Sequence, residues 1–261
     1  MNKTNYKLNA IGIIPARYES TRLPGKPLID ICGKTLLQRV WESASKANTL
    51  RRIIVATDDT RIKKMCTEIG AECLITPVSL PSGTDRIAFA YKKLADKADI
   101  VINIQGDEPL IKAKDIDKLV QTFSDSEFEV GTLIKMITKN KELFNPSVVK
   151  VVLGKNNQAL YFSRSPIPYL REAEPENWLK KQSYWKHIGI YAYKEKSLLD
   201  FIRLKSSALE QSEKLEQLRL LENGANYLCV KTDTELIGVD TLEDLKTVRK
   251  YIRDMNKKQI I

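Results

Sequence analysis

The 261-residue sequence contains one histidine and four cysteines, and no two cysteines form a C-x-x-C pair. A single histidine excludes a zinc site built from several histidines. Isolated thiols favour reduced, buried cysteines over a disulfide framework. The longest apolar run, Ala10–Ala16, is far shorter than the roughly 20 residues needed to cross a bilayer. The first ten residues lack the apolar core of a signal peptide. We therefore expect a cytoplasmic protein without membrane insertion.

The common sequence signatures of nucleotide and nucleic-acid binding are also missing. Neither G-x-x-x-x-G-K-[ST] nor G-x-G-x-x-G occurs. There is no RNP-type aromatic motif, zinc-finger spacing or block of basic residues. Lys and Arg nevertheless outnumber Asp and Glu by 43 to 33, a net charge of +10 that attracts anions. Charge alone leaves nucleic-acid binding unsupported, and we expect no nucleic-acid partner.

Short apolar segments alternate with helical patterns in the first 110 residues. β-Branched residues bounded by turn residues predict strands at Ala10–Pro15, Arg52–Thr57, Ala71–Thr76 and Ile100–Gln105. Apolar residues three or four apart predict helices at Leu36–Ala47, Thr60–Ile69 and Arg86–Ala95. This alternation predicts an α/β fold with an open, mostly parallel, Rossmann-like sheet.

The pattern changes after residue 130. Strands are predicted at Gly131–Ile137, Val148–Leu153, Ala159–Ser163 and Ile188–Tyr193. The polar segment Leu170–Lys186 is predicted to leave the sheet, and helices are predicted at Glu213–Asn223 and Leu242–Met255. We expect one domain over residues 1–261, with a smaller mixed insert around residues 130–210.

A basic loop follows the first predicted strand. Prolines at positions 15, 24 and 27 prevent a helix there, and the loop carries Arg17, Arg22 and Lys26. Three cations on one loop repel one another unless an anion lies among them, and a polyphosphate is such an anion. Gly25 would allow the backbone to approach that anion closely. The alternative is a basic surface loop whose charges face water.

Two aspartates are candidates for a metal site. Asp107 follows the predicted strand Ile100–Gln105, so it lies at the same carboxyl edge as the basic loop. Asp240 precedes the last predicted helix. If the fold brings these carboxylates together, a cation must offset their repulsion, and Mg²⁺ accepts carboxylate and phosphate oxygens. Alternatively, Asp107 is a turn residue and Asp240 caps the helix.

Nine segments, in order from about residue 11 to 250, resemble one enzyme family. They are IIPARYESTRLPGKPL, RIIVATDD, SGTDRIA, INIQGDEP, NPSVVKVVL, ALYFSRSPIP, HIGIYAY, LEQLRLLENG and GVDTLEDL. The sequence is similar to 3-deoxy-manno-octulosonate cytidylyltransferases. The first segment is shared with other sugar nucleotidyltransferases, whereas SRSPIP, HIGIY and LEQLR together favour this family.

The resemblance implies a nucleotide-diphospho-sugar transferase fold that transfers CMP from CTP to 3-deoxy-D-manno-octulosonate for lipopolysaccharide biosynthesis. It also implies a Mg²⁺ cofactor and a homodimer, with the region 130–210 serving sugar binding or oligomerisation. By resemblance, the catalytic residues are Arg17, Arg22, Lys26 and Asp107, and the metal ligands are Asp107 and Asp240. The substrate-binding residues implied in the same way are Ser82, Gly83, Thr84, Gln105, Arg164, His187, Tyr191, Glu216 and Gln217.

Three positions depart from the family's pattern: Asp85 replaces a usual Glu, Leu242 a usual Pro, and Gln38 a frequent His. The role of Asp85 is left open. His187 is either a hydrogen-bonded structural residue or a partner of a sugar hydroxyl. Arg164 is either a surface charge or a bidentate partner of the sugar carboxylate. A related nucleotidyltransferase with another acceptor and a non-catalytic anion-binding protein remain alternatives.

Overall fold

The computed structural model describes residues 8–19 and 22–258. The chain divides into two compact units. Unit 1 combines the residues up to Asp117 with those from Glu235 onward, and unit 2 comprises Lys118–Thr234. Unit 1 is therefore assembled from two stretches of sequence that flank unit 2.

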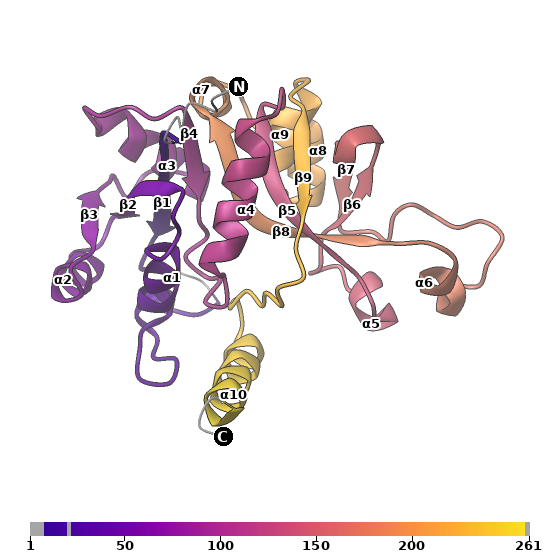
Figure 1. The fold of residues 1–261 in the computed structure, drawn as a ribbon, viewed down its shortest axis with the longest axis horizontal. Coiled ribbons are helices and arrows are strands. Elements are labelled where there is room, and N and C mark those ends of the chain that lie inside the picture. The colour runs from indigo at the N-terminus through magenta and orange to yellow at the C-terminus, as the bar shows by residue number, and fades with distance from the viewer. Residues whose placement is uncertain (1–7, 20–21, 259–261) are drawn as a thin grey trace, which may run out of the picture. The chain divides into compact units, whose positions relative to one another are not determined.

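The sheet of unit 1 is parallel, with the order β3-β2-β1-β4 (Figure 1). Its strands are β1 (Ala10–Ala16), β2 (Leu50–Thr57), β3 (Glu72–Ile75) and β4 (Ile100–Asn103). β1 is central, and most of its side chains are fully buried. The predicted α/β fold with parallel strands at these positions is confirmed.

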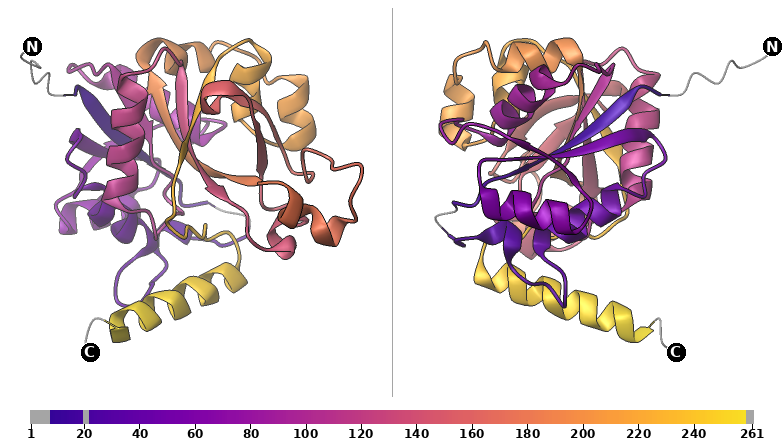
Figure 2. Two further views of the ribbon diagram at one scale, coloured as in Figure 1. Left: turned by 45° about the vertical axis from the view of Figure 1, so that its right-hand side comes forward. Right: turned by 90° about the vertical axis from the view of Figure 1, so that its left-hand side faces the viewer.

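Helices of unit 1 begin at polar caps. α1 (Leu36–Ala44), α2 (Thr60–Glu68) and α3 (Gly83–Lys93) start after Thr35, Asp59 and Ser82, whose side chains accept hydrogen bonds from the first turn. A short 3₁₀ helix, η1 (Lys26–Leu28), follows the basic loop. The last helix is α10 (Leu242–Lys258), drawn in yellow in Figure 2. It packs through Leu245, Val248 and Ile252 in one apolar cluster with Leu23 and Ile31.

Unit 2 has a mixed sheet. β5 (Val130–Met136) pairs antiparallel with β8 (Trp185–Lys194) and parallel with β9 (Tyr227–Lys231). β6 (Lys150–Leu153) pairs with both β8 and β7 (Ala159–Ser163). The remaining elements are α4 (Ala113–Ser124), in which the chain passes from unit 1 to unit 2, α5 (Asn140–Leu143), η2 (Lys155–Asn157), η3 (Pro175–Asn177), α6 (Trp178–Lys181), α7 (Glu195–Phe201), α8 (Ala208–Glu213) and α9 (Gln217–Glu222).

The predicted single helix Glu213–Asn223 is wrong. α8 ends at Glu213, and Lys214 adopts a left-handed conformation with φ 53°, so α9 begins only at Gln217. The carbonyls of Glu213 and Lys214 accept hydrogen bonds from the Arg164 guanidinium instead of from helical amides. A partner fifty residues away in sequence therefore interrupts the helix.

The polar segment from Leu170 leaves the sheet of unit 2 as predicted and carries η3 and α6 (Figure 1). Its predicted end at Lys186 is wrong, because Trp185 and Lys186 already belong to β8 and pair with β5. Trp178 is buried in a small cluster with Ile137, Leu143 and Tyr184, which anchors the base of this excursion. Across the described part of the chain, no helix is both long and apolar enough to traverse a membrane.

Candidate functional site

The basic loop after β1 is held by its own backbone and by an aromatic ring. Gly25 has a φ of 66°, a conformation that favours glycine, and its N–H donates to the Tyr18 carbonyl at 3.1 Å. The Arg61 guanidinium lies 3.3 Å from the centroid of the Tyr18 ring, a cation–π contact. These contacts fix where Lys26 begins η1.

The loop after β4 approaches the end of β1 closely. The Ile104 N–H donates to the Ile13 carbonyl at 3.1 Å, which continues the parallel pairing past the strand. A Cβ at Gly106 would lie 2.9 Å from the Pro15 carbonyl oxygen, so only glycine fits there without a shift. Asp107 follows this glycine and therefore lies beside the basic loop.

A backbone hydrogen bond brings the second aspartate to this place. The Val239 N–H donates to the Asp107 carbonyl at 2.9 Å. Thr241 and Asp244 form a reciprocal cap at the start of α10, in which each side chain accepts the other residue's N–H at 3.2 and 2.9 Å. Because Thr241 and Asp244 cap the helix, the alternative that Asp240 does so is wrong.

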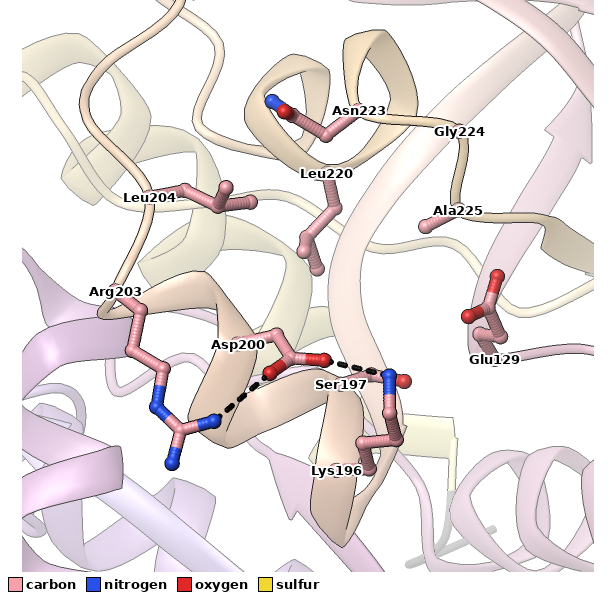
Figure 3. Close-up of a pocket in the computed structure, with 10 residues that line it drawn as sticks. All are labelled: Glu129, Lys196, Ser197, Asp200, Arg203, Leu204, Leu220, Asn223, Gly224 and Ala225. Carbon is pink, nitrogen blue, oxygen red and sulfur yellow. Dashed lines mark hydrogen bonds and ion pairs between the residues drawn. The ribbon is translucent and has the colours of Figure 1, made fainter.

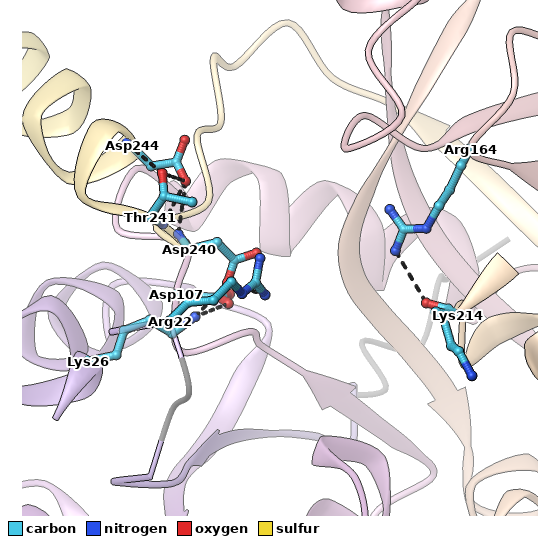
Figure 4. A network of polar contacts seen from close by, with 8 residues as sticks. All are labelled: Arg22, Lys26, Asp107, Arg164, Lys214, Asp240, Thr241 and Asp244. Atoms are coloured by element: carbon cyan, nitrogen blue, oxygen red, sulfur yellow. Dashed lines mark hydrogen bonds and ion pairs between the residues drawn. The ribbon is translucent and has the colours of Figure 1, made fainter. Parts of the chain in front are cut away.

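The side chains of Lys26, Arg22, Asp107 and Asp240 converge (Figure 4). The Lys26 Nζ lies 2.8 Å from an Asp107 oxygen and 3.0 Å from an Asp240 oxygen. An Arg22 nitrogen lies 3.2 Å from the same Asp240 oxygen. Burial disfavours the charged lysine, but the two ion pairs outweigh this effect and raise the pKa of Lys26. We call these four residues the ion cluster.

The ion cluster has carboxylate oxygens that can ligate a hard cation, but too few protein ligands to complete its coordination. Among the described residues, no group of three or more His, Cys, Asp or Glu side chains could hold a metal ion. Asp107 and Asp240 supply two carboxylates around a position that one positive charge already occupies. Two carboxylates suit Mg²⁺, which keeps several waters and takes phosphate oxygens as further ligands.

The other predicted residues of unit 1 lie around the same strand ends. The Ser82 hydroxyl caps α3: it accepts a hydrogen bond from the Asp85 backbone N–H and donates one to the Asp85 carboxylate. Asp85 therefore has a local structural contact. Gly83 and Thr84 form the first turn of α3, and a Cβ at Gly83 would lie 3.6 Å from Pro15. The Gln105 amide donates to Asn103 at 2.7 Å. Arg17 is exposed and forms no ion pair within the described residues.

Arg164 in unit 2 binds backbone carbonyls. Its guanidinium donates to the carbonyls of Pro146, Glu213 and Lys214 at 3.0, 2.6 and 3.3 Å (Figure 4 shows the last contact). The fully buried Lys150 also donates to the Arg164 carbonyl. Arg164 is half-buried, and three of its guanidinium N–H groups hold backbone carbonyls in place. Its remaining N–H groups are those available to an anion.

His187, Tyr191 and Gln217 form a second group within unit 2. The rings of His187 and Tyr191 have centroids 5.4 Å apart, and the Tyr191 hydroxyl donates to the Gln217 side chain at 3.2 Å. Burial raises the pKa of Tyr191 well above its usual range and lowers that of His187 to about 3. The Gln217 Nε2 is buried without a hydrogen-bond partner in the described structure, while Glu216 precedes α9.

A pocket elsewhere in unit 2 is lined by none of these residues (Figure 3). The charges of its side chains cancel, because Lys196 and Arg203 both pair with Asp200 at 2.8 and 3.2 Å and Glu129 supplies a second negative charge. The pocket therefore offers little free charge to a phosphate, and the ion cluster is the better candidate site.

Two contacts around the candidate site went unpredicted. The capping pair Thr241 and Asp244 had a local signal, since a Thr three residues before an acidic residue is typical of a capping box. Thr132, which contacts His187 at 3.1 Å, had none, because the pairing of β5 with β8 cannot be read from local sequence.

Comparison with known proteins gives concordant matches. The family model described as cytidylyltransferase matches residues 11–236. The chain is 45% identical to a 3-deoxy-manno-octulosonate cytidylyltransferase of Parabacteroides distasonis, over 93% of this chain and 97% of that protein. It is 46% identical to the protein of the same name in Thermodesulfovibrio yellowstonii, with the same two coverages. A solved structure of CMP:2-keto-3-deoxy-manno-octonic acid synthetase complexed with CTP superposes with a TM-score of 0.87 at 42% identity, covering 94% of this chain and 99% of that one.

Proposed function

Because the chain belongs to the 3-deoxy-manno-octulosonate cytidylyltransferases within the cytidylyltransferase family, we propose that it transfers CMP from CTP to 3-deoxy-D-manno-octulosonate and releases pyrophosphate. The product, CMP-KDO, would serve lipopolysaccharide biosynthesis. The observation that carries this proposal is the ion cluster, in which one ammonium group lies within 3.0 Å of two carboxylates that come from distant parts of the sequence.

The reaction is a displacement at the α-phosphorus of CTP by a sugar hydroxyl. Such reactions depend mainly on positioning and on neutralising charge. We propose that Arg17, Arg22 and Lys26 bind the triphosphate and stabilise the leaving pyrophosphate. Lys26 uses two of its three N–H donors on carboxylates, which leaves one for a phosphate oxygen. No protein nucleophile is required.

Asp107 and Asp240 would hold Mg²⁺. The ion, when bound, neutralises phosphate charge and lowers the pKa of a coordinated hydroxyl. The two carboxylates would hold the ion beside the basic loop. Since their side chains are 29% and 45% exposed, the site is open enough for waters and phosphate oxygens to complete the coordination.

We propose that Ser82, Gly83 and Thr84 lie beside the bound nucleotide. The sugar acid would contact Gln105, Arg164, His187, Tyr191, Glu216 and Gln217. The polar groups of His187, Tyr191 and Gln217 suit hydroxyl recognition because they combine hydrogen-bond donors with acceptors. We further propose a cytoplasmic homodimer. The excursion over residues 170–186 is its candidate interface. Tyr169, directly before this segment, is 75% exposed, and its ring packs edge-on against Trp178 within it.

A pyrophosphate-release assay with CTP, Mg²⁺ and the eight-carbon sugar acid tests the proposal. We expect turnover with this acceptor, none without an acceptor, loss of activity in EDTA and recovery on adding Mg²⁺. Turnover with another sugar acid but not with the octulosonate would assign a different acceptor. Salt-sensitive RNA binding without any pyrophosphate release would support the anion-binding alternative. Light scattering of the protein and of a Tyr169→Glu variant tests the dimer.

A further inference from the structure

The pairing of β5 with β8 contains a two-residue bulge. Ile134 pairs with His187 and Leu133 with Ile188, but the next residue, Thr132, pairs with Tyr191. Gly189 and Ile190 therefore have no partner on β5. Such irregularities reorient side chains and occur often beside functional sites.

The bulge brings His187 and Tyr191 together. Four residues apart on a regular strand, they would be separated by about 13 Å. Their partners on β5, Ile134 and Thr132, are only two residues apart, which is about 7 Å. The rings of His187 and Tyr191 accordingly meet with centroids 5.4 Å apart, and Phe162 covers the His187 ring edge-on at 5.0 Å.

The Thr132 side chain fills this bulge. It is fully buried, and its Oγ1 lies 2.8 Å from the Ile190 carbonyl oxygen, 3.1 Å from the Ile188 carbonyl oxygen and 3.1 Å from the His187 Nε2. A hydroxyl has one proton, and carbonyl oxygens only accept. If that proton pointed to Nε2, two carbonyl oxygens would face the lone pairs of Oγ1. The proton therefore goes to a carbonyl, and the imidazole Nε2 must donate to Oγ1.

We propose that Thr132 is a positioning residue for the sugar acid: it holds His187 as the Nε2–H tautomer, so that Nδ1 accepts a hydrogen bond from a sugar hydroxyl. That the partner of Nδ1 is a sugar hydroxyl rests on the proposed function, whereas the tautomer of His187 follows from the contacts of Thr132 alone. Nδ1 has no hydrogen-bond partner among the described residues, and His187 is half-buried. Burial keeps the imidazole neutral at pH 7, because it lowers the pKa of His187 to about 3. The alternative tautomer would present an N–H donor instead, so Thr132 decides which hydrogen-bonding role the ring can play.

The chain's single histidine makes the test direct. In ¹⁵N-labelled protein without a histidine tag, one imidazole gives the ¹H–¹⁵N correlations that distinguish Nε2–H from Nδ1–H. We expect the Nε2–H tautomer in the wild-type protein and in Thr132→Ser, which keeps the hydroxyl. Thr132→Val keeps the shape but loses the hydroxyl, and we expect a mixture of tautomers. A wild-type spectrum showing Nδ1–H would overturn the proposal, and so would an unchanged tautomer in a folded valine variant.

Kinetics then test the link to the sugar. Because one hydrogen bond is weakened, we expect Thr132→Val to raise the KM for the sugar acid roughly three- to ten-fold. The KM for CTP should stay unchanged, and Thr132→Ser should restore the wild-type values. Adding the sugar acid should also shift the Nδ1 resonance of the wild-type protein. Equal changes in both KM values, or no Nδ1 shift at saturating sugar acid, would refute the positioning role. If the octulosonate neither binds nor reacts, the proposed function fails while the tautomer spectrum still decides the role of Thr132.

Discussion

Replacing Lys26 by methionine tests the central geometry, because the substitution keeps the length of the side chain and removes its charge. In the wild-type protein this ammonium lies 2.8 Å from Asp107 and 3.0 Å from Asp240. Without it, the two carboxylate oxygens are left no more than about 6 Å apart. At that separation, two like charges repel by about 0.7–3 kcal/mol for effective dielectric constants between about 80 and 20. The exposure of both carboxylates favours the lower part of this range.

Two opposite effects should follow from Lys26→Met. Turnover should fall about 10²–10³-fold, as expected when one preorganised electrostatic partner of the transition state is lost. Divalent cations should bind the nucleotide-free protein more tightly, by roughly three- to one-hundred-fold, because an ion now relieves the repulsion that Lys26 had offset. Mn²⁺ titration followed by electron paramagnetic resonance measures the second effect without any turnover.

The matched control is Lys34→Met, which removes a more exposed lysine whose partner is Glu42. It should change neither turnover nor Mn²⁺ affinity. Weaker or unchanged Mn²⁺ binding in Lys26→Met would refute the idea that Lys26 and a metal ion share the same two carboxylates. Turnover close to the wild-type rate would remove Lys26 from the catalytic residues.

Three further changes probe the site and the packing that supports it. Asp107→Asn should lower turnover about 10³-fold and weaken Mn²⁺ binding, since it removes a charge from the proposed metal site; a folded variant with near-normal turnover would contradict this role. Arg86→Met removes one partner of the buried pair with Asp58 and should lower the free energy of unfolding in urea by about 3–5 kcal/mol, whereas Arg52→Met at an exposed pair should cost at most about 1 kcal/mol. The pKa of the buried Lys150 is lowered to about 8 from 10.5, mainly by burial, so between these pH values the unfolded chain holds a proton that the folded protein has released. The stability contributed by Lys150 should therefore rise from pH 8 to 10.5 by on the order of 2 kcal/mol. The free energy of unfolding of Lys150→Met in urea should lack this rise. Parallel pH profiles of the wild-type and variant free energies would argue against the lowered pKa of Lys150.

Local sequence predicted the parts of the fold that depend on neighbouring residues. The runs of β-branched residues in β1, β2 and β4 indicated buried parallel strands, and the prolines around Gly25 indicated a loop at their carboxyl edge. The sequence offered Asp240 only on the condition that the fold brings it beside Asp107, and the family resemblance implied its role as a metal ligand. Its approach to Asp107 depends on a backbone contact between Val239 and a residue 132 positions earlier. No periodicity in the sequence contains that information.

The remaining features depend on contacts between distant segments. Leucine spacing predicted one helix from Glu213, but Arg164 binds the carbonyls that this helix would have needed. Likewise, the alternation of residues in β8 predicts an ordinary strand from Ile188 onward. The bulge is defined only by the pairing of β8 with β5, which local sequence does not contain. In both cases a single side chain contacts backbone carbonyls of a distant segment: the Arg164 guanidinium donates to two of them, and the Thr132 hydroxyl donates its one proton to a carbonyl of the bulge.

The backbone link between Val239 and Asp107 has a consequence for biosynthesis. Unit 1 needs residues from Glu235 onward, so a ribosome must translate all of unit 2 before the second acid can reach the first. A nascent chain, or one cleaved by a protease ahead of Val239, carries the basic loop and Asp107 but has no Asp240. The ion cluster therefore forms only after unit 2 has been translated. If Asp240 holds the metal as proposed, proteolytic removal of the residues from Val239 onward would abolish turnover even where the rest of the protein stays folded.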